Sequence, residues 1–294
     1  MNSPQPVVAI VTGASRGAGR GIAIALGSHG CTVYVTGRSE KTGDHALPGT
    51  IYETAEAVTA AGGKGIAVRC DHADDAQANA MIEQVLAEQG RIDILVNNAA
   101  AVYDELSMPG GFWERPLKLG DMIDVGIRSS FDASWYAAQA MVKQNNGLIV
   151  FTSGAGAEHY VFSPAYGAHK AAMDKMAFDM AVDFRHAEAK VTALSIWMGA
   201  LATDRLLGMI EADELAALVS CGVTTGFCSA TKAGDVRPGD TVVIFGTGGV
   251  GMNAVQGAAW AGAKHVIAID PNEWKQQQAL TFGATHAFGD PDKA

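Results

Sequence analysis

The stretch VVAIVTGASRGAG, residues 7–19, decides the fold of this 294-residue chain. Residues 7–11 form an apolar run typical of a buried strand, and a helix-like segment follows Gly19. Gly13 would allow the tight turn between them, while Gly17 and Gly19 would let a pyrophosphate approach the backbone at a helix start, where the dipole favours negative charge. A strand, a glycine-rich turn and a helix in this order predict a phosphate-binding Rossmann-type unit.

Strand-like and helix-like segments alternate from this stretch to about residue 200. The alternation predicts an α/β fold built on a Rossmann-type doubly wound parallel sheet. The expected strands span residues 7–11, 32–36, 65–69, 92–96, 148–151 and 191–196. The expected helices span residues 54–61, 74–89, 119–143 and 165–187. Residues 39–50 and 102–116 are rich in glycine, proline and polar residues, so we expect them to be surface loops.

Three further residues, Ser153, Tyr166 and Lys170, have the chemistry of an acid-base site. Tyr166 and Lys170 are four positions apart, hence one turn apart on one helix face, where the ammonium would favour the ionised phenol. Ser153 follows a buried-strand pattern that would bring its hydroxyl to the same pocket. A Tyr-x-x-x-Lys spacing alone is also that of an ordinary exposed helix pair. Beside the glycine-rich turn, the three residues indicate redox chemistry between a carbonyl and an alcohol.

Taken in order, three motifs resemble a short-chain dehydrogenase/reductase over roughly the first 208 residues. They are Thr12-Gly13-x-x-x-Gly17-x-Gly19, Asn97-Asn98-Ala99-Ala100, and Ser153 with Tyr166 and Lys170. The resemblance implies a nicotinamide cofactor and hydride transfer to or from a carbonyl carbon. It implies that Tyr166 donates or accepts the proton, that Lys170 holds the ribose and lowers the tyrosine pKa, and that Ser153 hydrogen-bonds the substrate oxygen.

The resemblance also implies where the cofactor binds, with Asp71 facing the adenine. The expected contacts are Thr12, Gly13, Ser15, Arg16, Gly17, Gly19, Arg38, Asp71, Asn98, Tyr166, Lys170, Gly199 and Thr203. After the strand 32–36 an acidic side chain would bind the ribose diol of NAD, whereas this chain has Gly37 and Arg38, which leave room and a cation for a 2'-phosphate. We therefore expect NADP (NADPH) to be favoured over NAD, with help from Arg16, although an exposed arginine is often merely solvated.

Two positions depart from the family pattern. The family's fourth catalytic residue is an asparagine that shapes the long central helix, and this chain has Gly126 there. Glycine can also permit an irregular helix, so the departure puts activity in doubt without excluding it. After the strand 191–196 the family usually has Pro-Gly, and this chain has Met198-Gly199. Gly199 and Thr203 are still expected near the nicotinamide.

Composition narrows the function further. A formal charge of -10 and the lack of a basic run argue against nucleic acid and anionic membranes. Four cysteines without a Cys-x-x-Cys spacing, together with no signal peptide, predict a reduced, cytoplasmic protein. Eight histidines are scattered without ligand spacing, so no metal site is expected. The expected partner is a small carbonyl or alcohol substrate, and the family resemblance implies a homo-oligomer, a dimer or tetramer.

Two loops carry aromatic residues that could line the substrate pocket. One loop contains Phe112 and Trp113, and the loop after Ser153 contains Tyr160 and Phe162, with His159 beside them. Both loops would leave the sheet on the catalytic side. Each of these residues, taken singly, could equally be a packing residue.

The sequence changes character between Leu207 and Asp213, which predicts one domain over residues 1–208 and another over residues 209–294. The second part resembles the zinc-dependent medium-chain alcohol dehydrogenases through residues 221–226, 237–240 and the glycine run Gly246-x-Gly248-x-x-Gly251. Asp270 matches that family's ribose-binding acid, which implies NAD there. The resemblance covers only the opening β-α-β of a nucleotide domain, so we expect an appended partial Rossmann unit. Cys221 matches one zinc ligand whose partners are missing, and we interpret it as structural or vestigial.

Two arrangements of this tail remain open. Strand 241–245 could take the position of a seventh strand beside strand 191–196, since a short-chain sheet without one would expose an apolar edge. In that case residues 252–261 would form the following helix. Alternatively, the tail is a small separate β-α-β lobe or is partly disordered.

Three readings of function follow. The favoured one is a short-chain oxidoreductase fused to a medium-chain fragment. The second is a truncated fusion product that binds nucleotide but is catalytically inactive, because its substrate lid and last strand were replaced. The third is a bifunctional enzyme that binds two nucleotides per chain.

Overall fold

The computed structural model describes residues 5–199, 201, 203–205 and 221–290. The chain divides into two compact units, Met1–Met198 and Gly199–Ala294, and each is described by itself. The predicted junction between Leu207 and Asp213 lies outside the described residues. None of the described helices is both long and apolar enough to cross a membrane.

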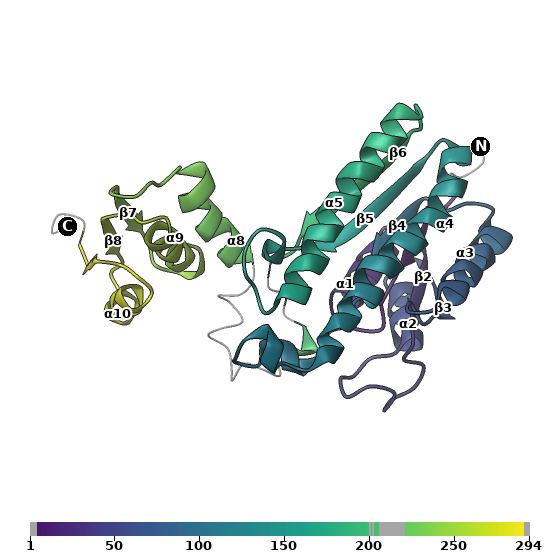
Figure 1. The fold of residues 1–294 in the computed structure, drawn as a ribbon, viewed down its shortest axis with the longest axis horizontal. Coiled ribbons are helices and arrows are strands. Elements are labelled where there is room, and N and C mark those ends of the chain that lie inside the picture. The colour runs from purple at the N-terminus through teal and green to yellow at the C-terminus, as the bar shows by residue number, and fades with distance from the viewer. Residues whose placement is uncertain (1–4, 200, 202, 206–220, 291–294) are drawn as a thin grey trace. The chain divides into compact units, whose positions relative to one another are not determined.

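The first unit contains a six-stranded parallel sheet, which confirms the predicted fold class (Figure 1). Its strands are β1 (Val8–Val11), β2 (Thr32–Gly37), β3 (Lys64–Arg69), β4 (Ile94–Asn97), β5 (Gly147–Ser153) and β6 (Val191–Trp197). They lie in the order β3-β2-β1-β4-β5-β6, so the chain reverses its direction of winding between β1 and β4. Loops that leave these two strands diverge, and the resulting crevice at the carboxyl edge is where doubly wound sheets bind nucleotides.

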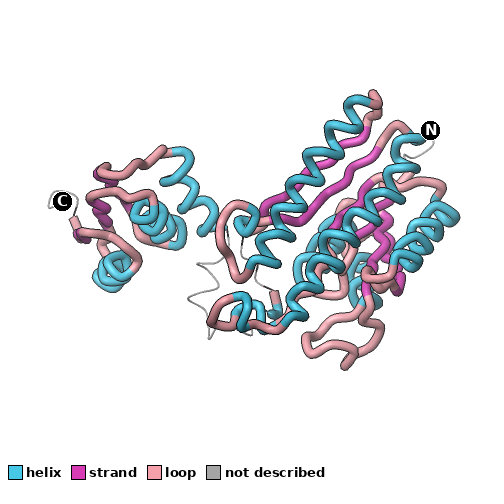
Figure 2. Tube along the Cα trace, viewed as in Figure 1, coloured by secondary structure: helices cyan, strands magenta, loops and turns pink. Residues whose placement is uncertain are grey.

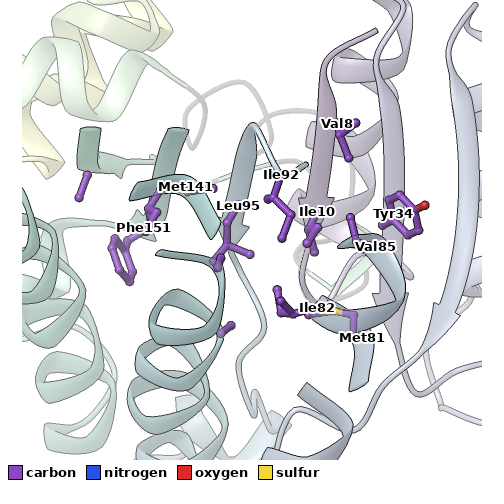
Figure 3. Close-up of a cluster of buried hydrophobic side chains, with 14 of the residues drawn as sticks. Val8, Ile10, Tyr34, Met81, Ile82, Val85, Ile92, Leu95, Met141 and Phe151 are labelled. Atoms are coloured by element: carbon purple, nitrogen blue, oxygen red, sulfur yellow. The ribbon is translucent and has the colours of Figure 1, made fainter. Parts of the chain in front are cut away.

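Helices cover both faces of this sheet, and each face has its own buried core (Figure 2). They are α1 (Gly17–Ser28), α2 (Ile51–Ala60), α3 (Asp75–Gln89), α4 (Ser129–Gln144) and α5 (Pro164–His186). One core joins β1, β4 and β5 to α3, α4 and α5, with Ile10, Leu95 and Phe151 fully buried (Figure 3). The other core lies against α1 and α2 around Val33 and Val58. Both faces of the central strands are apolar because both are covered.

Two predicted helices differ from the structure. α2 begins at Ile51, three residues before the predicted start, because Thr50 and Glu53 form a reciprocal capping box. The single helix expected over 119–143 is divided, because a π-helical segment η4 (Ile123–Arg128) with non-helical dihedral angles at Val125 precedes α4. Three short 3-10 helices, η1 (Asp104–Ser107), η2 (Phe112–Glu114) and η3 (Leu117–Gly120), organise the loop before it.

The second unit is a small parallel three-stranded sheet with the order β7-β8-β9. Its elements are α8 (Cys221–Cys228), η6 (Ser229–Ala233), β7 (Thr241–Phe245), α9 (Gly249–Trp260), β8 (His265–Ile269), α10 (Glu273–Thr281) and β9 (His286–Phe288). The expectation of a bare β-α-β was too short, since α10 and β9 add a second crossover. Asn272 caps α10 by accepting from the backbone of Lys275. A separate core around Val255, Val266 and Ala268 holds this unit together.

The prediction that residues 241–245 complete the first sheet is wrong. β7 pairs with β8 over its whole length, from Thr241 opposite His265 to Phe245 opposite Ile269. Within the described residues β6 pairs with β5 alone. The short crossover through α9 makes β8 the local partner of β7, which favours the alternative of a separate lobe.

Candidate active site

The loop after β1 is fixed to the loop after β4 by hydrogen bonds through Thr12. Thr12 Oγ1 donates to the Val96 carbonyl at 3.2 Å and accepts from the backbone N–H groups of Asn98 at 2.9 Å and Ala99 at 3.0 Å. The Asn98 amide in turn donates to the carbonyls of Thr12 at 2.9 Å and Gly13 at 3.1 Å. Thr12 and Asn98 therefore hold the loops after β1 and β4 in register.

The glycine-rich loop leaves no room for side chains, as a diphosphate cradle requires. Gly13 and Gly17 have φ values of 63° and 56°, which favour glycine. A Cβ at Gly13 would lie 2.7 Å from the Ala99 Cα, and one at Gly19 would lie 2.5 Å from the Asn98 amide nitrogen. The loop ends at the N-terminus of α1, where negative charge is favoured. These residues fit a dinucleotide, which would be held by the loop and would supply or accept a hydride.

Two cations lie at the carboxyl end of β2, where the resemblance places the adenosine ribose. Arg16 donates to the hydroxyl of Ser39 and to the carbonyl of Gly49, both at 2.8 Å. Arg38 is 64% exposed and pairs with the Asp71 carboxylate at 3.8 Å. The structure thus brings together Arg16, Arg38 and Asp71 around β2, whereas Ser15 is buried beneath them in the loop.

The acid-base residues come together at the carboxyl edge of β5. Ser163 caps α5 by accepting from the backbone of Tyr166 at 3.2 Å, which fixes the tyrosine in the first helical turn. Lys170 follows one turn later, with Nζ 5.6 Å from the centre of the Tyr166 ring. Ser153, the last residue of β5, donates to the Lys170 carbonyl at 3.1 Å. Ser153, Tyr166 and Lys170 therefore form one cluster in the structure.

The expected effect of Lys170 on the tyrosine pKa is wrong for the protein by itself. Burial raises the pKa of Tyr166, because the phenolate loses hydration. Burial also lowers the pKa of Lys170 to about 8, although the charge of Asp174 opposes that change. The ammonium lies over the ring and donates to the Thr152 carbonyl at 3.0 Å instead of contacting the phenol oxygen. At neutral pH Tyr166 therefore keeps its hydroxyl proton.

Several residues around Tyr166 were not found from the sequence. A Cβ at Gly156 would lie 2.5 Å from the Tyr166 ring, so the loop after β5 packs directly on it. Leu106, Leu119 and Met122 form a small buried cluster, and Tyr103, Ala165 and Tyr166 pack against it. A lone glycine or leucine in a loop carries no sequence signal for such a contact. The loop 102–122 therefore belongs to the site structurally.

Phe162 is an aromatic residue in direct contact with the predicted proton donor. Its ring meets the Tyr166 ring edge-on with centroids 5.2 Å apart. The φ value of Phe162 is 62°, a strained region for a bulky residue. Arg115 donates to the carbonyl of Phe162 and, at 3.3 Å, to that of Leu106, so one guanidinium joins the two loops. This clamp holds Phe162 in place.

The remaining predicted aromatics are exposed. Phe112 and Trp113 contact each other edge-on at 5.4 Å and are 63% and 75% exposed, and Tyr160 is 74% exposed. Exposure of this size contradicts the alternative that they are packing residues. Gly199 and Thr203 fall in the second unit, and their contact with the nicotinamide stays a prediction.

In the second unit the buried side chain of Asp270 holds the glycine-rich loop after β7. The Asp270 carboxylate accepts from the backbone N–H groups of Thr247 at 2.8 Å and Asn272 at 3.0 Å. Burial raises the pKa of Asp270, but these backbone hydrogen bonds outweigh it and leave the pKa lowered. The side chain of Cys221 lies outside the described residues. Over the part of the chain that the structure describes, no cluster of three potential metal ligands is present.

The first unit thus has the fold and the site geometry of a Rossmann-type nucleotide-binding oxidoreductase. The sequence profile of the short chain dehydrogenase family matches residues 7–212, and this chain belongs to that family of NAD(P)-dependent oxidoreductases. A profile of zinc-binding dehydrogenases matches residues 249–293. The chain is therefore a fusion of a short-chain dehydrogenase with an alcohol dehydrogenase-like segment.

Individual relatives agree with this division. Human dehydrogenase/reductase SDR family member 1 is 39% identical over 212 residues, 71% of this chain and 64% of that protein. Alcohol dehydrogenase B of Mycobacterium tuberculosis is 60% identical over 81 residues, 28% of this chain and 22% of that protein. The chain thus spans less than two thirds of the first relative and about a fifth of the second.

Solved structures resemble the first unit. A metagenomic short-chain oxidoreductase in complex with NADP has a TM-score of 0.57 and 29% identity, covering 66% of this chain and 83% of that one. A Serratia marcescens short-chain dehydrogenase/reductase mutant has a TM-score of 0.58 and 33% identity, covering 72% of this chain and 80% of that one.

Proposed function

We propose that this chain transfers a hydride between NADP(H) and a carbonyl or alcohol substrate by a Ser-Tyr-Lys mechanism. The cluster of Ser153, Tyr166 and Lys170 carries the proposal, because it lies at the same carboxyl edge of the sheet as the glycine-rich loop. A nucleotide held by that loop and a substrate held near Tyr166 would then meet over the carboxyl ends of the central strands.

The chemistry requires one hydride and one proton. Bound NADPH would supply the hydride to the carbonyl carbon. Tyr166 would donate its hydroxyl proton to the carbonyl oxygen, so that the C=O π bond breaks while new C–H and O–H bonds form. Ser153 would orient that oxygen, for which its hydroxyl must exchange its present hydrogen bond to the Lys170 carbonyl. The Lys170 ammonium would stabilise the phenolate that remains.

We propose reduction of the carbonyl as the favoured direction. A tyrosine whose pKa is raised by burial holds its proton at neutral pH, as a proton donor must. Alcohol oxidation would instead require the phenolate as a base. Lys170, with a pKa of about 8, is mostly protonated at neutral pH and suits the same direction.

NADPH is the proposed cofactor because of the charges at β2. Arg38 is exposed there and Arg16 donates to Ser39, so two guanidinium groups and a hydroxyl would be available to a 2'-phosphate bound at this end of β2. The carboxylate that is present, Asp71, already pairs with Arg38. The similar metagenomic short-chain oxidoreductase, whose structure was solved in complex with NADP, supports this choice.

The proposed substrate is an apolar, uncharged carbonyl compound. Phe162 meets the Tyr166 ring edge-on, and Leu106, Leu119 and Met122 pack close to it. Arg115, one of the charged side chains nearby, is already bonded to two carbonyl groups. These surroundings favour burial of an apolar substrate over recognition of a carboxylate or phosphate.

We also propose a homo-oligomer in the cytoplasm, as the sequence predicts. Phe131 and Trp135 of α4 and Phe178 of α5 are each at least half exposed, which supports an interface on these helices. The buried free thiols of Cys31 and Cys70 suit a reducing compartment. Light scattering on the purified chain would give the oligomeric state.

The main test combines a carbonyl panel with a tyrosine variant. The chain should oxidise NADPH in the presence of apolar ketones or aldehydes, and Tyr166→Phe should lower kcat by about a hundredfold or more with an unchanged Tm. Tyr52→Phe is the matched control, because Tyr52 is exposed on α2. If Tyr166→Phe keeps most of the activity, the assigned role is wrong.

The second candidate is an inactive fusion protein that only binds nucleotide. Leu194 and Ile196 of β6 are 36% and 49% exposed, an apolar face that favours the idea of a replaced C-terminal region. Stoichiometric NADPH binding without turnover across the panel would decide for this candidate.

A further inference from the structure

A buried chain of hydrogen bonds joins the carboxyl ends of β1, β2 and β3. It consists of the side chains of Thr36, Cys70 and His72, which are 0%, 0% and 6% exposed. His72 Nε2 lies 2.9 Å from the Thr36 hydroxyl, and His72 Nδ1 lies 3.8 Å from the Cys70 sulfur. Thr36 Oγ1 in turn donates to the carbonyl of Val11, the last residue of β1, at 3.4 Å. The contacts therefore cross the three strands whose following loops carry the expected cofactor residues.

The hydrogen bonds of this chain all run in one direction. Thr36 Oγ1 has a single hydrogen, which it donates to Val11, so it accepts the hydrogen of His72 Nε2. Nδ1 then carries the lone pair and accepts from the Cys70 thiol, whose pKa burial raises to about 12. Burial also lowers the pKa of His72 to about 4, although the charge of Asp71 opposes that change. The imidazole is thus neutral, and both of its nitrogens have partners inside the protein.

The chain of hydrogen bonds fixes the two segments that carry the charges at the end of β2. Thr36 precedes Arg38 by two positions, and its carbonyl accepts a hydrogen bond from the backbone of the glycine-rich loop. His72 directly follows Asp71, whose carboxylate accepts from the backbone N–H of Ala73 at 3.1 Å. The hydrogen bond between His72 and Thr36 therefore joins the turn that holds Asp71 to the strand end that holds Arg38.

The spacing between Arg38 and Asp71 matters for a bound phosphate. Arg38 Nη1 lies 3.8 Å from Asp71 Oδ2, whereas a fully formed hydrogen-bonded ion pair has a distance of about 2.8 Å. A carboxylate that closed onto the guanidinium would occupy the donors that a 2'-phosphate needs, and it would place a like charge beside the phosphate. The side chain of Arg38 is 64% exposed and can adjust, so the position of the turn at Asp71 decides this spacing.

We propose that His72 is a positioning residue for the choice of cofactor, which holds Asp71 away from Arg38 so that the guanidinium can bind the 2'-phosphate of NADPH. The inference rests on the proposed function. His72 acts through Thr36 and through the turn at residues 71–73. Without its hydrogen bond to Thr36, the turn could relax toward Arg38 and weaken the binding of NADPH. NADH has a ribose diol in place of the 2'-phosphate and should keep its affinity.

Two substitutions in the intact chain separate this polar role from packing. His72→Leu keeps a side chain of similar size without hydrogen bonds, whereas His72→Gln keeps an amide N–H close to the position of Nε2. We expect His72→Leu to lower the affinity for NADPH about tenfold and the affinity for NADH less than about twofold. His72→Gln should keep both affinities within about threefold of the parent. Fluorescence titration with each cofactor gives the affinities, and thermal unfolding shows whether each variant is folded.

The same hydrogen bond can be removed from its other side. Thr36→Val replaces the hydroxyl by a methyl group, and it should lower the ratio of NADPH to NADH affinity about as much as His72→Leu does. It also provides the test if His72→Leu does not fold. In a Thr36→Val background, His72→Leu should have no further effect on the ratio. The control is His29→Leu, an exposed position directly after α1, which should keep the parental ratio.

Three results would overturn the inference. One is a His72→Leu variant that loses both affinities equally or keeps both, another is an equal change of the ratio in the Leu and Gln variants, and the third is additive losses in the double variant. A parent that binds NADH more tightly than NADPH would overturn the proposed cofactor and this inference together. A parent that prefers NADPH, with the same ratio in His72→Leu and Thr36→Val, overturns only the inference.

Discussion

The two units begin with the same local structure and differ in what surrounds it. Gly13 and Gly246 both follow a strand with positive φ values of 63° and 82°. In both loops a later glycine approaches this first one, since a Cβ at Gly19 would lie 2.6 Å from the Gly13 carbonyl and one at Gly251 would clash with the Gly246 carbonyl. A glycine fingerprint therefore specifies a turn, whatever the function of the unit that contains it.

The two units differ in the order of their strands. β1 lies between β2 and β4, so a crevice opens where the winding reverses. β7 lies at the edge of its sheet, with β8 as its partner among the described residues. Val243 and Phe245 on β7 are 45% and 69% exposed, as expected for a parallel sheet covered on one face only. A dinucleotide site therefore requires the whole doubly wound sheet, which the first unit contains.

The largest expected effect concerns the choice of cofactor by the first unit. Arg38→Asp replaces a cation that would bind a 2'-phosphate with a carboxylate that would bind a ribose diol. In the parent, the Arg38 guanidinium lies 3.8 Å from the Asp71 carboxylate. We expect the ratio of NADPH to NADH affinity to fall by about a hundredfold. Titration of the parent and the variant with both cofactors measures it. A parent that binds NADH more tightly than NADPH would contradict the proposal that the charges at the end of β2 in the first unit select NADPH.

The next effect is the pH dependence of the reduction. The Lys170 pKa of about 8 means that its ammonium is lost as pH rises through that value. Tyr166, whose pKa burial raises above its usual value, keeps its proton over the same range. Steady-state kcat should therefore fall about tenfold for each pH unit above 8. A flat profile to pH 10 would mean that the ammonium is not required.

The smallest effect should come from removing the second unit. Since β7 pairs with β8 and not with β6, a chain that ends after Gly208 should still fold and bind NADPH with an affinity within about threefold of the parent. Circular dichroism and NADPH titration would show this. Aggregation of the truncated chain would instead mean that the second unit protects the exposed face of Leu194 and Ile196.

The sequence predicted most of the first unit because its signals are local. Apolar runs and the glycine turn each specify their own segment, and Ser153, Tyr166 and Lys170 meet because a strand end and one helix turn bring them together. The capping box of Thr50 was also readable but was not used. By contrast, the contacts of His169 with Gly126 and of Gly156 with Tyr166 join segments far apart in the chain. No spacing rule reveals such contacts.

The arrangement of the tail could not be predicted for a different reason. The run Thr241–Phe245 suits either sheet equally by its composition, and the choice depends on which partner strand is reached by the shorter crossover. The pKa of Tyr166 was predicted with the wrong sign because helix spacing gives the distance to Lys170 but not the burial of the phenol.

The most direct test of the account is the number of nucleotides that bind to the full chain. Calorimetric titration with NADPH should give one site per chain. Gly19→Val should abolish binding, because a side chain there would meet the Asn98 amide and the Gly13 carbonyl, and Gly251→Val should lower the stability of the second unit without changing the titration. Two sites per chain, or binding that survives Gly19→Val and is lost in Gly251→Val, would contradict the claim that the first unit alone forms the dinucleotide site.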